Sequence, residues 1–256
     1  MKSMMKRNTF REIKKSFGRY FAILAIIALG VAFFSGLKIT QSVMVHSADV
    51  YLKDLQFYDY RLVSTLGFTE ENVEALAEKE DVRAAEGAIS AEVLYKDAGE
   101  NERVIKMHSI TEKVNKLKLV AGEMPQSADE CVVDSVLFSE DAIGSKLVLS
   151  ENNTTDDLDK FAYKEYTITG LVQSPCYIQF ERGNTSIGNG RISGFAYILK
   201  DGFAVDYDTE IYIKFDEDYD IYSDEYDSYM DAKEADWEAY TCLLYTSPSP
   251  RDKRQS

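Results

Sequence analysis

The sequence predicts an α+β protein with a single N-terminal transmembrane helix, a mixed, strand-rich extracytoplasmic domain and a stalk helix after that domain. Three observations predict this class. Residues 20–37 contain no charged side chain. In the rest of the chain, strand-like segments outnumber helical ones and do not alternate regularly with them, as they would in a parallel α/β sheet. An acidic stretch with helical spacing of apolar residues follows the last strand-like segment.

The charge of the chain is divided between a basic start and an acidic body. The first 38 residues hold eight Lys or Arg and one acidic residue, whereas the rest hold 21 basic and 43 acidic residues. An acidic body repels phosphate backbones, so we expect no nucleic-acid partner. Hydrophobic residues make up 45% of the chain, which is enough for the body to bury a core.

The uncharged segment 20–37 predicts a membrane span. As a helix it would be about 27 Å long, close to the ~30 Å hydrocarbon core of a bilayer. Two other interpretations stay open. A cleaved signal peptide would have a shorter apolar stretch, and a buried core helix would have polar residues on part of its surface. The side chains expected to anchor the span are Tyr20, Phe21, Ile23, Leu24, Ile26, Ile27, Leu29, Val31, Phe33, Phe34 and Leu37.

The basic residues before the span predict its orientation. Lys and Arg concentrate on the cytoplasmic side of membrane helices, and only Lys38 and Lys53 follow the span closely. We therefore expect the N-terminus in the cytoplasm of a bacterium and the acidic body outside its plasma membrane. Apolar residues at helical spacing within 10–21 predict either a helix lying on the inner membrane surface or an extension of the span. The residues that determine this topology are Lys2, Lys6, Arg7, Arg11, Lys14, Lys15 and Arg19.

The sequence of the first half of the body predicts a helix, a strand, a second helix and a pair of strands, in that order. Residues 43–55 are expected to continue the first helix, and 58–67 alternate as a strand does. Thr69 is a candidate N-cap, with acidic residues in the next turn, for a short helix. Residues 84–97 and 102–110 are expected to be two strands paired around a turn.

The second half contains five further strand candidates. A polar loop, "ENNTTDD", separates the second from the third. The candidates are "CVVDSVLF", "SKLVLS", "YTITGLVQSP", "GFAYILK" and "DTEIYIKFDE".

An acidic helix is predicted after the last strand. Residues 206–238 hold 14 acidic residues and two lysines, and Ser223 is a candidate N-cap. The helix carries a stripe with 4-3-4-3 spacing, in which Lys233 is the least apolar member. We expect this stalk helix to return toward the membrane beside the first one. The stripe consists of Tyr226, Met230, Lys233, Trp237 and Tyr240.

No catalytic, cofactor-binding or metal-ligating residues are expected. The three cysteines, Cys131, Cys176 and Cys242, are far apart and lack CxxC spacing. A bridge between Cys131 and Cys176 is one possibility outside the cell, and two free buried thiols are the other. The two histidines, His46 and His108, have no partners that the sequence can identify.

Several short motifs, in a fixed order, resemble those of one family. The basic start with "SFGRYFAILAIIALGVAFFSGLK" and "YDYRLVSTLGFTEENVEALAEKEDV" resembles the beginning of FtsX-like/MacB-like ABC transporter permeases. The segments "LVAGEMPQSADECVVD", "IGSKLVL", "YTITGLVQSP", "FERGNTSIGNGRISGFAYI" and "DTEIYIKF" are similar to the MacB-like extracytoplasmic core domain of such permeases. The resemblance covers residues 5–240.

The resemblance implies a permease subunit with one N-terminal span, an extracytoplasmic core domain and at least three further spans. It implies a cytoplasmic ABC ATPase as a separate subunit, and a second permease copy or a paired permease in the same bilayer. Members act on lipoproteins, antimicrobial peptides or cell-wall hydrolases, so an extracytoplasmic substrate or protein is an implied partner. The family has no catalytic residues that could be carried over to this chain.

The last residues depart from the family pattern. After Tyr240, "TCLLYTSPSPRDKRQS" loses the acidic character and contains two of the four prolines. We expect a foreign tail joined to a truncated permease; a natural disordered terminus is the alternative. A complete single-pass sensor or adhesion module is the rival function, and a membrane-anchored enzyme is a third. The predicted organisation is a basic cytoplasmic segment at 1–19, a span at 20–37, the domain at 38–222, the stalk helix at 223–241 and the tail at 242–256.

Overall fold

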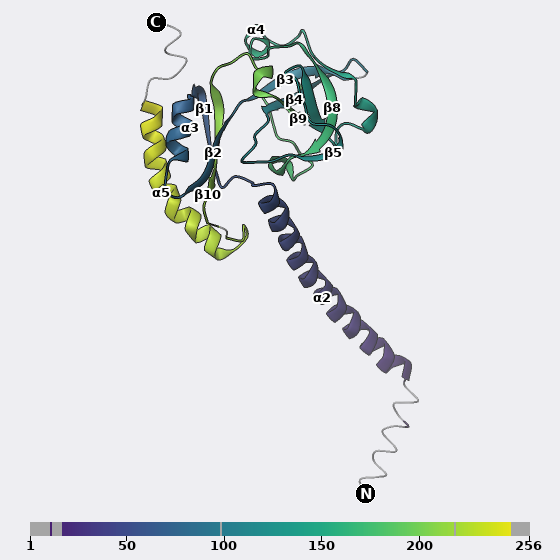
Figure 1. Ribbon diagram of the computed structural model, residues 1–256. Coiled ribbons are helices and arrows are strands. Elements are labelled where there is room, and N and C mark those ends of the chain that lie inside the picture. Colours follow the sequence, from purple (N-terminus) through teal and green to yellow (C-terminus); the bar gives the residue numbers. More distant parts are fainter. Residues whose placement is uncertain (1–10, 12–16, 98, 218, 247–256) are drawn as a thin grey trace. The chain divides into compact units, whose positions relative to one another are not determined.

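The computed structural model describes residue 11 and residues 17–97, 99–217 and 219–246 (Figure 1). The chain divides into two compact units, Met1–Val50 and Tyr51–Ser256. Helix α2 (Phe17–Asp54) supplies most of the first unit, and all strands belong to the second. Because strands and helices are mixed without regular alternation, the predicted α+β class is confirmed.

A three-stranded antiparallel sheet lies at one side of the second unit. Strand β10 (Asp208–Phe215) is its centre, between β1 (Tyr60–Phe68) and β2 (Val82–Ala88). Helices α3 (Glu70–Ala77) and α5 (Asp224–Thr246) lie along this sheet in Figure 1. Their apolar side chains share one core with the sheet, formed by Leu62, Phe68, Leu76, Val82, Ala85, Ile211, Ile213, Phe215 and Trp237.

Helix α3 begins at the predicted cap. The backbone N–H of Thr69 donates to the side-chain oxygen of Asn72 (2.9 Å), and the N–H of Asn72 donates to the hydroxyl of Thr69 (3.3 Å). This reciprocal capping box satisfies two N–H groups that the helix cannot pair. Glu70 and Glu71 occupy the first turn, where the helix dipole favours negative charge.

The remaining seven strands form a second sheet in the order β5-β8-β6-β9-β4-β3-β7. Because β7 also pairs with β8, six of them close into a barrel, and β5 extends the sheet beside β8. The pairs β4–β9 and β6–β8 are parallel, and the others are antiparallel. The strands are β3 (Ser90–Lys96), β4 (Glu102–Ser109), β5 (Lys118–Gly122), β6 (Glu130–Asp134), β7 (Lys146–Leu149), β8 (Glu165–Gln173) and β9 (Ile192–Ile198).

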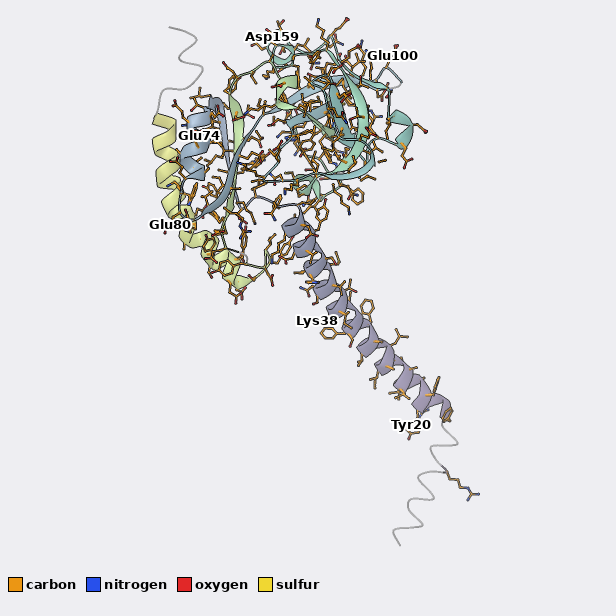
Figure 2. All side chains as sticks on the ribbon, viewed as in Figure 1. Tyr20, Lys38, Glu74, Glu80, Glu100 and Asp159 are labelled. Atoms are coloured by element: carbon orange, nitrogen blue, oxygen red, sulfur yellow. The ribbon has the colours of Figure 1, made fainter. Side chains whose placement is uncertain are left out.

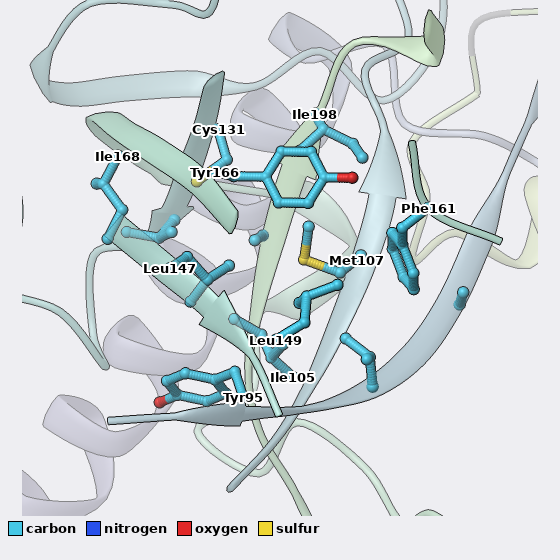
Figure 3. Close-up of a cluster of buried hydrophobic side chains, with 14 of the residues drawn as sticks. Tyr95, Ile105, Met107, Cys131, Leu147, Leu149, Phe161, Tyr166, Ile168 and Ile198 are labelled. Carbon is cyan, nitrogen blue, oxygen red and sulfur yellow. The ribbon is translucent and has the colours of Figure 1, made fainter. Parts of the chain in front are cut away.

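Side chains from these strands fill the barrel. Tyr166 is fully buried, and its hydroxyl donates to the carbonyl of Gly202 (2.7 Å), so the barrel holds no unpaired polar group at that point. Close packing of large residues explains how a short-stranded barrel keeps one register. The labelled members in Figure 3 are Tyr95, Ile105, Met107, Cys131, Leu147, Leu149, Phe161, Tyr166, Ile168 and Ile198.

Short helices lie in the segments that follow the barrel strands. Helix α4 begins inside the stretch predicted to be only a polar loop, because the hydroxyl of Thr154 accepts from the N–H of Asp157 (3.2 Å) and caps it. The loop prediction was therefore wrong at these positions. These short helices are η1 (Glu140–Ala142), α4 (Thr155–Leu158), η2 (Pro175–Tyr177) and η3 (Lys200–Gly202).

The predicted strand at 84–97 is two strands in two sheets. The chain changes sheet at Ile89, which is 1% exposed. There, the N–H of Ile89 donates to the hydroxyl of Ser109 (2.9 Å), and the N–H of Ser109 donates to the carbonyl of Ile89 (2.8 Å). The single-strand prediction was wrong because continuous strand-like composition does not reveal a change of partner strand. The predicted pairing with 102–110 is confirmed for the second half alone, as β3 with β4.

Candidate functional site

The helix predicted to span the membrane is unbroken. Of the residues described, only those of α2 form a helix long and apolar enough to cross a bilayer. All eleven predicted anchor side chains, from Tyr20 to Leu37, are 51–73% exposed. Figure 2 shows side chains projecting along α2 between the labelled Tyr20 and Lys38. Such a surface needs an apolar surrounding, because none of the residues that the structure describes covers it.

Two of the predicted topology-determining residues can be placed. Arg11 and Arg19 are in helical conformation, and both are exposed. The other five, Lys2, Lys6, Arg7, Lys14 and Lys15, lie outside the described residues. The orientation of the span therefore stays a prediction.

A buried aspartate joins three parts of the second unit. One carboxylate oxygen of Asp59, just after α2, lies 2.9 Å from the ammonium of Lys214 and accepts from the hydroxyl of Tyr226 (3.1 Å). The other oxygen accepts from the N–H of Phe215 (2.9 Å). The side chains of Asp59 and Lys214 are only 4% and 7% exposed. We call these four residues the Asp59 clamp; it holds the segment after α2 against β10 and α5.

The predicted stripe on α5 faces the three-stranded sheet. Trp237 is buried in the core of that sheet, and Met230 packs against the same core. Lys233, expected to be the weak member, lies 2.6 Å from the carboxylate of Asp81, and its ammonium lies over the ring of Tyr229 (5.4 Å). The side chain of Tyr240 falls outside those described. The stripe therefore attaches α5 to the domain; its role as a stalk stays a prediction.

A second buried carboxylate connects the two sheets. Glu210 of β10 is 2% exposed and accepts from the hydroxyls of Ser90 (2.6 Å) on β3 and of Tyr212. The ammonium of Lys106 on β4 lies 3.7 Å away, and the guanidinium of Arg61 on β1 lies 3.9 Å away. Polar groups with defined geometry thus fix the small sheet to the barrel.

A buried histidine, His108, contacts two tyrosines in the wall of the barrel. His108 is 5% exposed, stacks on Tyr197 with 5.0 Å between ring centres, and places Nε2 2.6 Å from the hydroxyl of Tyr177. The hydroxyls of Tyr197 and Ser174 are 2.7 Å apart. Burial, together with repulsion from Lys106, lowers the pKa of His108 to about 3. The imidazole is therefore neutral at physiological pH.

The lowered pKa of His108 predicts that the domain loses stability in mild acid. In the unfolded chain the group titrates near its ordinary value of 6.5, so below that pH the unfolded state binds a proton that the folded state does not. Between pH 6 and pH 5 we expect the free energy of unfolding to fall by up to about 1.4 kcal/mol per pH unit. Urea unfolding of the full chain at pH 7, 6 and 5 measures the slope.

Two variants test whether His108 causes this dependence of the free energy of unfolding on pH. His108→Gln is expected to flatten it, whereas His46→Gln, which removes an exposed histidine, should leave it unchanged. An unaltered slope in His108→Gln would contradict the assignment.

A buried ion pair holds a loop beside the barrel. The guanidinium of Arg182 binds both carboxylate oxygens of Asp134, at 2.7 and 2.9 Å, and the two side chains are 6% and 2% exposed. It also donates to the carbonyl of Tyr177 (3.0 Å) and lies over the ring of Phe195 (5.4 Å). Between these anchors, Phe180 is 88% exposed. No sequence signal indicated this pair, because its members are 48 positions apart.

The thiols of Cys131 and Cys176 are free. Burial raises the pKa of the Cys176 thiol to about 11 and raises that of Cys131 further. Both are therefore protonated and poor nucleophiles at neutral pH. Within the described part of the chain, no three His, Cys, Asp or Glu side chains are grouped so that they could hold a metal ion.

Several solved structures resemble the chain. One is the extracellular domain of the noncanonic ABC-type transporter YknZ from Gram-positive bacteria (12% identity, TM-score 0.39, covering 60% of this chain and 76% of that chain). Another is the periplasmic region of MacB from Actinobacillus actinomycetemcomitans (13% identity, TM-score 0.42, covering 72% of this chain and 76% of that chain). A domain of a permease protein from Porphyromonas gingivalis is also similar (14% identity, TM-score 0.34, covering 60% of this chain and 63% of that chain). No family model and no curated protein matches the sequence.

Proposed function

We propose that the chain is part of the permease subunit of an ABC transporter of the FtsX/MacB type. In this role Tyr20–Leu37 anchors the protein in the plasma membrane, with the basic N-terminus inside and the acidic domain outside. A separate cytoplasmic ATPase hydrolyses ATP, and the permease carries the resulting motion to an extracytoplasmic substrate or protein. The order of the family-like motifs in the sequence supports this type of transporter.

The observation that carries the proposal is the continuity of α2. Its 38 residues form a helix about 57 Å long, nearly twice the ~30 Å hydrocarbon core. In the proposed role, a displacement of the membrane-embedded part of this helix moves the residues that continue it beyond the bilayer. The Asp59 clamp follows five residues after the helix ends.

The contacts of the second unit suggest how such motion would spread. The Asp59 clamp fixes the chain after α2 to β10 and α5, and Lys53, in the last turn of α2, lies 2.7 Å from Asp220, just before α5. Glu210, also on β10, then connects this sheet to the barrel. In the proposed role, α2 and α5 would both border the membrane. Motion of either helix would move β10, and β10 would move the barrel.

The proposed partners follow from this role. They are a cytoplasmic ABC ATPase, a second permease copy or a paired permease, the lipid bilayer, and an extracytoplasmic substrate or protein of unknown identity. Sequencing the gene beyond the codon for Tyr240 distinguishes the proposed transporter subunit from a complete single-pass sensor. A transporter requires further spans there and an ATPase subunit in the same organism, whereas a sensor requires neither.

The orientation of the span is testable with two cysteine variants. Ser186→Cys introduces a thiol at an exposed position of the domain, and Ser3→Cys introduces one before the span. We expect a membrane-impermeant maleimide to label Ser186→Cys on intact cells. Ser3→Cys should react only after permeabilisation.

The parent chain gives the baseline, because it carries the same three native thiols, Cys131, Cys176 and Cys242, as both variants. The opposite labelling pattern would place the domain in the cytoplasm and refute the proposed role.

A further inference from the structure

A cavity of about 740 Å³ opens at one mouth of the barrel, where the ends of β3 and β4 meet η1 and β7. Ligand sites in proteins are concave, have volumes of roughly 300–1,000 Å³, and are common in the mouths of β-barrels. The cavity is far from the Asp59 clamp in sequence and shares none of its residues. It therefore needs an explanation of its own.

The floor of the cavity is apolar and continuous with the barrel core. Tyr95, at 2% exposure, packs on Phe138 with ring centres 6.0 Å apart, and Leu147 is also buried. Leu137 and Ala142 border the same space. These side chains present hydrocarbon to the cavity, which favours an apolar group of a ligand.

Three of the residues that line the cavity carry hydrogen-bond donors, namely Tyr95, Lys96 and Arg103. Among the described residues, no partner reaches the hydroxyl of Tyr95, although the side chain is almost wholly buried. Figure 3 shows its oxygen turned away from Leu147 and Leu149. Burial raises the pKa of Tyr95 to about 12, so the hydroxyl remains a donor.

Two residues with cationic side chains also line the cavity. Lys96 is exposed, lies opposite Glu102 of β4, and forms no ion pair within 4 Å with any described residue. Arg103 lies opposite Tyr95 on β4 and uses Nε to bind Asp97 (2.9 Å). Donors of this kind suit a ligand group that accepts hydrogen bonds and carries negative charge.

Acidic residues limit how much negative charge a ligand can bring. Asp97, Glu100 and Asp141 also line the cavity. A polyanion would be repelled by them, whereas a single carboxylate could approach Tyr95 and Lys96. We propose that the barrel mouth binds an amphiphile with one acyl-like apolar tail and one monoanionic head group. The tail lies on the floor formed around Phe138 and Leu147, and the head is held by Tyr95, Lys96 and Arg103.

Photo-crosslinking of the full chain in lipid nanodiscs tests this site. The probe is lauric acid with a diazirine in its tail, and adducts are mapped by mass spectrometry of peptides. We expect saturable adducts on 137–148, suppressed by unlabelled laurate. Since a membrane lipid has the same chemistry, a second arm uses diazirine-labelled phosphatidylglycerol in the disc. Cavity adducts in either arm support the site and identify the source of the amphiphile.

Two variants separate the cavity from general partitioning into lipid. Ala142→Trp fills the cavity and should abolish its adducts, whereas Ala162→Trp makes the same change at an exposed position elsewhere and should not. Lys96→Ala, on the rim, is expected to raise the half-saturating laurate concentration about tenfold, through loss of one charge-assisted hydrogen bond. Adducts confined to 20–37 in both arms, or equal labelling of the two tryptophan variants, would overturn the proposal. Neither result depends on the orientation of the span.

Discussion

Replacing Arg182 with alanine is expected to lower the free energy of unfolding by about 3–5 kcal/mol, because it leaves a buried carboxylate without its partner. The side chain of Asp134 is only 2% exposed and has both oxygens bound by the guanidinium. The same change also removes the donor to the carbonyl of Tyr177. Urea unfolding of the full chain in nanodiscs, read by pulse proteolysis, measures the loss.

Arg103→Ala is the matched control. It breaks an arginine–aspartate pair of similar length (2.9 Å), but the partners are 47% and 20% exposed, so we expect a loss of at most about 1 kcal/mol. The double variant Arg182→Met with Asp134→Leu removes both buried charges. It should be more stable than Arg182→Ala alone, because no unpaired charge remains. Equal losses in the two single arginine variants would show that the burial of the Arg182 pair has no energetic consequence.

Features that depend on neighbouring residues were predictable from the sequence. The helix start at Thr69 follows from a capping residue and the acids behind it, and the structure places it there. The apolar run at 20–37 predicts an uninterrupted helix, which α2 confirms. The hairpin of β3 and β4 joins two strand-like segments across a short turn and was predictable for the same reason.

Features that depend on distant residues were not predictable. Closure of the barrel needs β7 to pair with β8, and neither strand carries a signal for its partner. The change of sheet at Ile89 is decided by β4 and β10, which follow later in the chain. Lys233 is the least apolar member of its stripe, and the sequence does not reveal its partner, because Asp81 is 152 positions away. Which strands or side chains pair depends on contacts between residues that are distant in sequence. A pattern of residue types along one segment indicates only which of its side chains are buried.

The Asp59 clamp is the strongest case of such long-range pairing, and its loss should be large. Asp59→Asn keeps an acceptor for the N–H of Phe215 but leaves the ammonium of Lys214, at 7% exposure, without a counter-charge. We expect the free energy of unfolding to fall by about 3–5 kcal/mol. Because Tyr226 binds the same carboxylate, α5 should also detach more readily, which trypsin cleavage after Lys233 would reveal.

Asp81→Asn is a closely matched comparison, since it removes the same charge from an aspartate–lysine pair that also holds α5. Its partners are 32% and 27% exposed, so the expected loss is at most about 1 kcal/mol, and cleavage after Lys233 should rise far less. If α5 detaches equally in both variants, the clamp is not what couples that helix to β10. The proposed route from the membrane helix to the barrel would then have to run through the apolar contacts of Met230 and Trp237 instead. If Asp59→Asn and the parent chain have the same free energy of unfolding, the clamp does not stabilise the attachment of the segment after α2 to β10 and α5. The clamp would then be excluded from the proposed route.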